Sequence, residues 1–301
     1  LTDDAGRVGV GEAAPLPGFG PETFDEVVTA LHGFFGQARM QQLPSDVPSL
    51  RAFMAANDDP PASVRHAVEQ ALLDLLAQRA AIPLTRLLSD REPRATLPMH
   101  RVISSPETAS AAVADGLRTL KIKVGVEALT TEVARIAAIR AAVGPDIALR
   151  LDANGAWDTE LATASLERFA SHGIQSIEQP VPADDLAGLA TLRAHFADID
   201  ILADESCRTL EDVDRLLAAN AVDGFVIKPM LAGGLLPVLD MSQRAVDAKL
   251  PVSITSSIDS AIARSAARQV ASIVPGELLS CGLDTGPLLA RDLVPRSEVP
   301  Q

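Results

Sequence analysis

From residue 97 onward, the chain alternates between short apolar runs and longer segments whose apolar positions recur at helical spacing. Short apolar runs bounded by polar or turn-forming residues predict buried strands, and longer amphipathic segments predict helices. The predicted strands are 98–103, 118–124, 147–152, 174–178, 200–204, 223–228, 251–255 and 278–282. The predicted helices are 106–115, 127–143, 158–171, 184–196, 209–218, 234–248 and 258–273.

This alternation implies parallel strands that are joined by right-handed crossovers. Eight strand–helix units within about 190 residues favour an α/β fold of the (β/α)8 barrel type. A doubly wound open sheet is the alternative, but no GxGxxG pattern follows the first predicted strand. Functional residues of a barrel lie where strands end and βα loops begin, so the strand ends are the place to look for chemistry.

Residues 1–95 follow a different pattern, with a predicted strand at 7–12 and a loop rich in proline and glycine at 13–20. Helices are predicted at 21–37, 45–56 and 61–79, the last with a stripe formed by Val64, Ala67, Val68, Ala71, Leu72, Leu75 and Leu76. We interpret 1–95 as a small α+β capping domain and 96–301 as the barrel, with the C-terminal tail packing back on the capping domain. The chain begins at Leu1 inside a strand–turn unit, so we expect an N-terminal part of the capping domain to precede it.

Charge and composition narrow the class of partner. The 301-residue chain has a net charge of −14, which argues against nucleic acid or an anionic membrane surface as partner. No apolar run reaches the length of a membrane span, and no signal peptide is visible. The two cysteines, Cys207 and Cys281, do not form a disulfide framework. We therefore expect a cytoplasmic protein whose ligand is a small molecule.

Lysine is rare in this chain, with only four residues, at positions 121, 123, 228 and 249. Two of them occupy alternate positions of the predicted strand LKIKV (120–124), so both side chains should lie on one face. Two adjacent ammonium groups disfavour each other's charged form, and at least one lysine should therefore have a lowered pKa. Such a lysine can act as a general base, whereas arginine stays protonated. The alternative is a surface strand with two solvated lysines.

Acidic residues end three successive predicted strands. Asp152, Glu178 and Asp204 lie 26 residues apart, and Lys228 ends the next strand 24 residues later. Each acidic residue alone would be read as a helix cap or a solvated loop residue. Three of them at one end of a barrel would repel one another unless a cation were shared. Oxygen ligands without histidine or cysteine favour Mg²⁺, with Mn²⁺ as the alternative.

The motifs at these strand ends resemble those of the enolase superfamily, in its muconate-lactonizing branch. They are LKIKVG (120–125), RLDANGAW (150–157), IEQP (177–180), LADES (202–206) and VIKP (226–229). The segment GEAAPLPGF (11–19) is similar to the specificity loop of the family's capping domain. The resemblance implies metal-assisted abstraction of a proton α to a carboxylate, by a magnesium enzyme that acts on a small carboxylate.

Carried over residue by residue, the resemblance implies a role for each motif. Asp152, Glu178 and Asp204 would bind the metal. Lys123 would be the acid/base on one face of the substrate and Lys228 the residue opposite. The supporting residues would be Lys121, Asn154 and Glu205, of which Glu205 would hold Lys228 or a metal ligand in place.

Two further strand ends distinguish members of the branch. The seventh, ITSSIDS (254–260), has no histidine base, and the eighth, SCGLDTG (280–286), has one aspartate instead of a DxD signature. This pairing most resembles the o-succinylbenzoate synthases, which dehydrate 2-succinyl-6-hydroxy-2,4-cyclohexadiene-1-carboxylate. The residues expected to hold the succinyl tail are Pro17, Phe19, Ser256, Ser257, Gly282 and Leu283. The alternatives are an N-acylamino-acid racemase or another enzyme of the branch and, more remotely, a non-catalytic barrel that binds a small acid.

Overall fold

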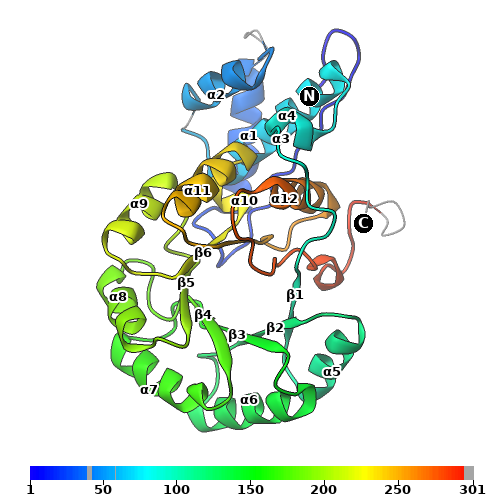
Figure 1. The fold of residues 1–301 in the computed structure, drawn as a ribbon. Coiled ribbons are helices and arrows are strands. Elements are labelled where there is room, and N and C mark those ends of the chain that lie inside the picture. The colour runs from blue at the N-terminus through cyan, green and yellow to red at the C-terminus, as the bar shows by residue number, and fades with distance from the viewer. Residues whose placement is uncertain (39–42, 58, 295–301) are drawn as a thin grey trace.

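A computed structural model describes residues 1–38, 43–57 and 59–294, and its central feature is a curled parallel sheet (Figure 1). Seven strands pair in chain order, each parallel to the next. They are β1 (His100–Ile103), β2 (Thr119–Lys123), β3 (Ala148–Asp152), β4 (Ile174–Glu178), β5 (Asp200–Ala203), β6 (Gly224–Ile227) and β7 (Val252–Ile254). The first seven predicted strands are confirmed.

Residues 278–282, the eighth predicted strand, connect the two edges of this sheet through isolated bridges. On one side Leu278 pairs with Val252 and Gly282 with Thr255, and on the other side Cys281 pairs with Met99. Backbone hydrogen bonds follow both edges, including Gly282 N to Ile254 O at 3.1 Å and Cys281 N to Pro98 O at 2.7 Å. The segment therefore closes the sheet into a barrel, although its pairing is too interrupted to make a continuous strand.

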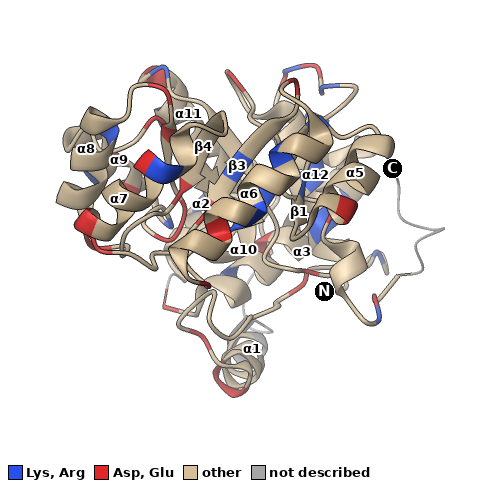
Figure 2. Ribbon diagram, turned by 90° about the horizontal axis from the view of Figure 1, so that it is seen from below, with Lys and Arg blue, Asp and Glu red and all other residues tan. Residues whose placement is uncertain are grey.

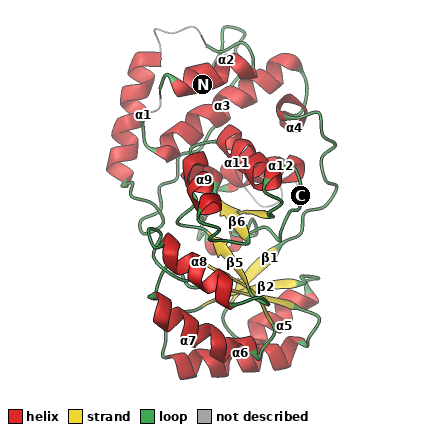
Figure 3. Ribbon diagram, turned by 60° about the vertical axis from the view of Figure 1, so that its left-hand side comes forward, coloured by secondary structure: helices red, strands yellow, loops and turns green. Residues whose placement is uncertain are grey.

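The seven predicted barrel helices are all present and surround the sheet (Figure 3). They are α5 (Pro106–Ala114), α6 (Leu129–Val143), α7 (Thr159–Ala170), α8 (Leu186–His195), α9 (Leu210–Ala218), α11 (Leu235–Asp247) and α12 (Ala261–Ile273). Side-chain caps define several starts, such as the reciprocal capping boxes of Ser105 with Thr108 and of Thr209 with Asp212. The short helices α4 (Leu84–Leu88) and α10 (Pro229–Ala232) and the 3₁₀ turn η1 (Gly286–Leu288) were not predicted.

The N-terminal part contains three longer helices, α1 (Phe24–Ala38), α2 (Val47–Ala55) and α3 (Ala62–Ala80). The predicted apolar stripe of α3 is buried throughout, and α3 packs against α10 and α11 of the barrel (Figure 1). The predicted strand at 7–12 is wrong, because within it only Val8 forms a bridge, to Thr2. Gly9 and Gly11 instead allow this segment to lie directly against α3. A Cβ on Gly11 would lie only 1.8 Å from the carbonyl oxygen of Ala67.

The division into a capping domain and a barrel remains a prediction, as does the packing of the tail on the capping domain. In the described part of the tail, Asp292 accepts a hydrogen bond from Ala261 N at 2.8 Å and pairs with Arg264 of α12 at 2.7 Å. The tail is therefore anchored to a barrel helix at Asp292, and residues 295–301 lie outside the described residues.

Charged positions of both signs are interspersed over the outer helices (Figure 2). Among the described residues, no helix is both long and apolar enough to cross a membrane.

Glu69 of α3 is a buried carboxylate that joins the N-terminal helices to the barrel. It is 2% exposed and accepts hydrogen bonds from Leu235 N and, at 2.9 Å, from Leu236 N in the first turn of α11. Burial raises the pKa of this carboxyl group to about 7, against the opposing effect of those backbone donors. The folded protein therefore binds a proton at Glu69 over a pH range in which the unfolded chain has lost it.

Because its pKa is raised on folding, Glu69 contributes stability at low pH that is lost as the pH rises toward 7. We expect Glu69→Gln to remove this loss, so that the variant gains about 2–3 kcal/mol relative to wild type between about pH 5 and about pH 8. Urea unfolding of both proteins at each pH measures the difference. A difference that does not change with pH would contradict the prediction.

Candidate active site

A cavity of about 480 Å³ opens at the end of the barrel where the predicted functional residues gather. Of the predicted site residues, its lining includes Phe19, Lys121, Lys123, Asp152, Lys228, Ser256 and Gly282. It also includes His100, Arg101, Val102, Thr255, Ile258, Asp284, Thr285, Pro287 and Leu288, which were not predicted. Residues from β1 to β3, β6, β7 and the closing segment therefore share one cavity.

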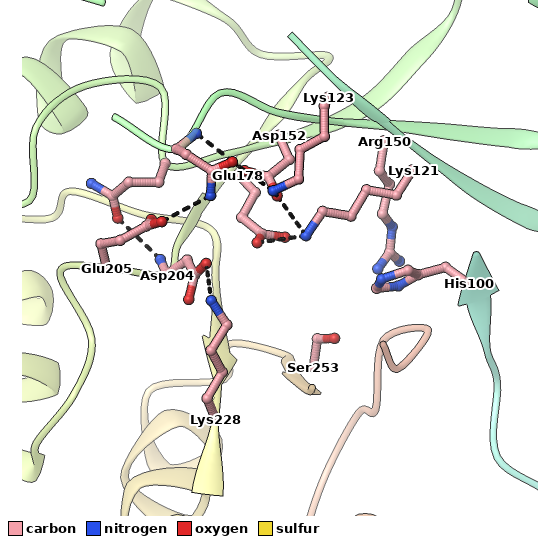
Figure 4. Close-up of polar contacts among 12 residues, drawn as sticks. His100, Lys121, Lys123, Arg150, Asp152, Glu178, Asp204, Glu205, Lys228 and Ser253 are labelled. Atoms are coloured by element: carbon pink, nitrogen blue, oxygen red, sulfur yellow. Dashed lines mark hydrogen bonds and ion pairs between the residues drawn. The ribbon is translucent and has the colours of Figure 1, made fainter. Parts of the chain in front are cut away.

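Lys121 lies between two of the predicted metal ligands (Figure 4). Its Nζ is 2.7 Å from Asp152 Oδ2 and 2.7 Å from Glu178 Oε1, and the side chain is buried. Burial by itself would lower the pKa of the lysine, but the carboxylates of Asp152 and Glu178 outweigh it and raise the pKa above its ordinary value. The lowered pKa expected from the neighbouring lysine is therefore wrong for Lys121, because the carboxylates lie closer to it.

Lys123 shares the cavity face of β2 with Lys121, as the alternation of the strand predicts. Its Nζ lies 2.5 Å from Asp152 Oδ2 and donates to Asn154 Oδ1 at 2.5 Å. Asn154 in turn donates from Nδ2 to Glu205 Oε1 at 2.9 Å. Glu205 therefore holds Asn154, and through it Lys123, whereas the family resemblance implied that it would hold Lys228 or a metal ligand. With 38% of its side chain exposed, Lys123 is the most accessible of the three site lysines.

Lys228 enters from β6, on the side opposite Lys123 (Figure 4). Its Nζ is 2.5 Å from Asp204 Oδ2, and it lies 5.2 Å from the ring centroid of Phe19, within the range of a cation–π contact. Burial opposes charge on Lys228, but the Asp204 carboxylate outweighs this effect and raises the pKa of the lysine. Phe19 is fixed by a hydrogen bond of 3.3 Å from Arg208 Nη2 to its carbonyl oxygen. The predicted specificity loop therefore covers Lys228.

The three predicted metal ligands are buried at the ends of β3, β4 and β5. Lysine ammonium groups lie between them, and within residues 1–38, 43–57 and 59–294 no three His, Cys, Asp or Glu side chains are arranged to hold a metal ion. Burial and the charge of Asp152 raise the pKa of Glu178 to about 8. Glu205 is a fourth carboxyl group in this cluster, and repulsion from the carboxylates of Asp152 and Asp204 contributes to the raised pKa of Glu178. The oxygen donors of the cluster suit a hard divalent cation that would share them with the lysines.

Gln179 fixes the position of two of these strand ends. Its Oε1 accepts hydrogen bonds from Asp204 N at 3.0 Å, Ser206 N at 3.2 Å and Ser206 Oγ at 2.8 Å. Its backbone has a φ of +39°, and Asn154 has a φ of +47°, so the chain turns sharply directly after β4 and shortly after β3. Left-handed backbone at non-glycine residues is uncommon and concentrates at functional sites.

The predicted succinyl-binding residues divide into two groups. Phe19, Ser256 and Gly282 line the cavity, and Ser256 Oγ lies 2.5 Å from Thr285 Oγ1. The other three residues, Pro17, Ser257 and Leu283, are not part of the lining. Pro17 is exposed, whereas Leu283 is fully buried in the core.

His100 and Arg101 were not predicted as site residues. Functional residues were expected at the carboxyl ends of strands, whereas His100 and Arg101 are the first two residues of β1. Arg101 donates to Asp284 Oδ2 from Nε at 3.0 Å and from Nη2 at 2.9 Å, and to Asp115 at 2.6 Å. The aspartate of the eighth strand end is therefore already bound to an arginine. One feature of the sequence could have indicated them. In a closed barrel the first predicted strand lies next to the eighth, and Asp284 follows shortly after the eighth strand.

The family model "Enolase C-terminal domain-like" matches residues 105–300. The hydrophobic dipeptide epimerase of Enterococcus faecalis is 32% identical over 247 residues, which are 81% of this chain and 69% of that protein. The N-succinyl-L-Arg/Lys racemase of Bacillus cereus is 27% identical over 90% of this chain and 74% of its own length. The o-succinylbenzoate synthase of Thermobifida fusca is 33% identical over 66% of this chain and 63% of its own length.

Solved structures agree with the barrel fold. The dipeptide epimerase of E. faecalis in complex with Mg and the dipeptide L-Leu-L-Tyr superposes with a TM-score of 0.88 at 31% identity. The match covers 98% of this chain and 83% of that one. The relatives are thus similar in fold but differ in reaction, since epimerases, a racemase and a synthase are all among them. Because the family model covers well over half of the sequence, including every strand end that carries the lysines and carboxylates, the chain belongs to the enolase superfamily.

Proposed function

We propose that this protein dehydrates 2-succinyl-6-hydroxy-2,4-cyclohexadiene-1-carboxylate to 2-succinylbenzoate with the help of Mg²⁺. The observation that carries the proposal is the pair of lysines that enter one cavity from opposite sides of the barrel. Lys123 of β2 and Lys228, which directly follows β6, both line it, and each is bound to a carboxylate at a neighbouring strand end. A base on one face of the substrate and a cation on the other are what abstraction of a proton α to a carboxylate requires.

Asp152, Glu178 and Asp204 are the residues that would hold the metal. Their oxygen atoms, their burial and the repulsion among their carboxylates fit a divalent cation. Related structures support magnesium, since the E. faecalis epimerase structure contains Mg. When bound, the cation would offset the negative charge that develops on the substrate carboxylate.

Lys123 acts as the base in this proposal. The ammonium form is held by Asp152 and Asn154, so the lysine must lose that proton before it can accept one from the substrate. The proton on the α-carbon then moves to Lys123 Nζ, and the electron pair of the C–H bond moves toward the carboxylate to give an enediolate. Lys228, held as a cation by Asp204, stabilises that charge from the other face. The C–O bond at C6 then breaks, the departing oxygen takes the proton from Lys123, and water leaves as the ring becomes aromatic.

The charge of the cavity supports an acid without an ammonium group. The carboxylates in the described lining are Asp152 and Asp284, and both are already bound to cations. A dipeptide would bring an ammonium group that needs a free carboxylate. Substrates with a succinyl group bring no ammonium group and therefore need no free carboxylate in the lining.

Racemization of N-succinylamino acids is the second candidate. It is favoured by the placement of Lys228. This residue lines the cavity, so it can serve as an acid/base toward a bound substrate and not only as a static cation. The B. cereus relative supports this candidate by its name. A non-catalytic barrel that binds a small acid is less well supported, because binding alone needs no base and Lys123 stays partly exposed in the cavity.

Turnover of the cyclohexadiene substrate tests the proposal directly. We expect the purified protein to form 2-succinylbenzoate, detected by absorbance, with Mg²⁺ present and to lose this activity in excess chelator. Loss of α-deuterium from labelled N-succinylamino acids, measured in parallel, tests the second candidate. A folded, magnesium-supplemented protein that shows only the second activity would replace the first proposal with racemization, and one that shows neither would overturn both.

A further inference from the structure

His100 lies at the floor of the cavity with one ring nitrogen fixed and the other free. The residue is 5% exposed, and it projects toward Arg150 and Lys121 (Figure 4). Its Nδ1 lies 2.9 Å from the carbonyl oxygen of Ser280. A carbonyl oxygen can only accept, so Nδ1 must carry the hydrogen. The same oxygen also accepts from Ser253 Oγ at 2.9 Å and from Arg150 Nη1 at 3.2 Å.

This arrangement leaves Nε2 as a hydrogen-bond acceptor. Burial and the charge of Lys121 lower the pKa of the imidazole to about 3, so the ring is neutral and Nε2 presents a lone pair. In the described part of the chain, Nε2 has no hydrogen-bond partner, although the residue lines the cavity. A ring nitrogen that accepts and has no partner at a cavity wall is available to a donor group of a bound ligand.

A second polar group without a partner lies beside it. Thr255 Oγ1 is buried and forms no hydrogen bond with any described residue, and Thr255 also lines the cavity. Gly282 separates the two residues: a Cβ there would lie 3.0 Å from His100 Nε2 and 3.1 Å from Thr255 Cβ. The absence of that Cβ leaves a notch between His100 Nε2 and the Cβ and Cγ2 methyl group of Thr255. We define the polar notch as His100, Thr255 and Gly282.

We propose that the polar notch binds a neutral O–H or N–H group of the substrate, which donates a hydrogen bond to His100 Nε2. This inference rests on the proposed function, in which the donor is the 6-hydroxyl of the cyclohexadiene. In the racemase alternative, the donor is the amide N–H of the N-succinylamino acid. A carboxylate does not fit next to Nε2, because two lone pairs would face each other. The notch therefore recognises the group next to the reacting carbon and not the succinyl tail.

The product of the proposed reaction provides a sharp test, because 2-succinylbenzoate lacks the hydroxyl group. We expect His100→Leu to raise KM for the cyclohexadiene about tenfold, the effect of one hydrogen bond to a buried group. The dissociation constant of 2-succinylbenzoate, measured by calorimetry with Mg²⁺ present, should change less than about twofold. His100→Gln, which keeps an acceptor near the notch, should show a smaller effect on KM than His100→Leu.

Two further variants separate binding from structure. Gly282→Ala keeps the His100 side chain but places a methyl group 3.0 Å from Nε2, which blocks the notch, and it should also raise KM more than it weakens product binding. Ser253→Ala removes a donor to the Ser280 carbonyl group without touching Nε2, and it should leave the ratio of KM to product affinity unchanged. The proposed role of the polar notch would be contradicted if His100→Leu and Gly282→Ala weakened the binding of substrate and product equally. It would also be contradicted if neither variant weakened substrate binding.

An ester analogue tests the racemase alternative, in which the amide N–H of an N-succinylamino acid is the donor to His100 Nε2. If the wild type racemises N-succinylamino acids, it should prefer them to the matching O-succinyl 2-hydroxy acids, which have no N–H group. His100→Leu should abolish that preference, and its persistence would overturn the notch. An active wild type with unchanged variants contradicts only the notch, whereas a folded wild type without either activity contradicts the proposed function and the notch together.

Discussion

Lys123→Ala is expected to lower kcat for the proposed dehydration by about 10³-fold or more, since a positioned acid/base group contributes about 10²–10⁴-fold and Lys123 serves in two steps. The first step takes the α-proton and the second returns it to the departing oxygen. Because Lys123 is the most exposed of the three site lysines, its removal should disturb the fold little. Steady-state absorbance assays at saturating Mg²⁺ measure the loss.

Lys123→Arg separates the base from the charge. Arginine can keep the ion pair with Asp152, but it does not release its proton near neutral pH. We therefore expect Lys123→Arg to be nearly as inactive as Lys123→Ala while retaining more of the affinity for 2-succinylbenzoate. Lys249→Ala is the matched control, since Lys249 is exposed and does not line the cavity. Substantial activity in Lys123→Arg would contradict the role of Lys123 as base.

The barrel and the identity of its charged strand ends could be predicted because they depend on local patterns. Buried parallel strands appear as apolar runs, and the first seven of them lie where that pattern placed them. The period of strand and helix then brings Asp152, Glu178 and Lys228 to one end of the sheet whatever the details of the loops. The alternation of β2 likewise places Lys121 and Lys123 on the same face.

Features that depend on contacts between distant segments could not be predicted. The raised pKa of Lys121 follows from two carboxylates on other strands, and no spacing in the sequence shows how close they lie. The segment 278–282 divides its pairing between the two edge strands of the sheet, so it forms isolated bridges and no continuous strand. His100 escaped notice because a histidine at the start of a strand is normally far from the chemistry. Here the cavity extends down to it.

The three site lysines differ in burial and in the groups that hold them. Lys121 and Lys228 are buried and bound to carboxylates that raise their pKa values, which keeps both as cations. Lys123 is more exposed and is held by Asp152 together with the neutral amide of Asn154. A base must exchange its proton, whereas a stabilising cation must retain it. The proposed division of roles follows from this difference.

Lys228→Ala should lower kcat for dehydration by about 10²–10³-fold, the typical loss when one group that stabilises developing negative charge is removed. Lys228→Arg keeps a cation next to Asp204 and beneath the Phe19 ring, on which a guanidinium group can stack. If Lys228 is a static cation, Lys228→Arg should retain most of the dehydration activity that Lys228→Ala loses. If Lys228 exchanges protons, as a racemase requires, both variants should lose racemization, and to the same extent they should lose α-deuterium exchange from the enantiomer whose α-hydrogen faces Lys228. Phe19→Leu, which keeps the apolar cover but removes the ring, is the matched control for the cation–π contact. Dehydration that is as low in Lys228→Arg as in Lys228→Ala would contradict a purely electrostatic role, because the charge is present in one variant and absent in the other.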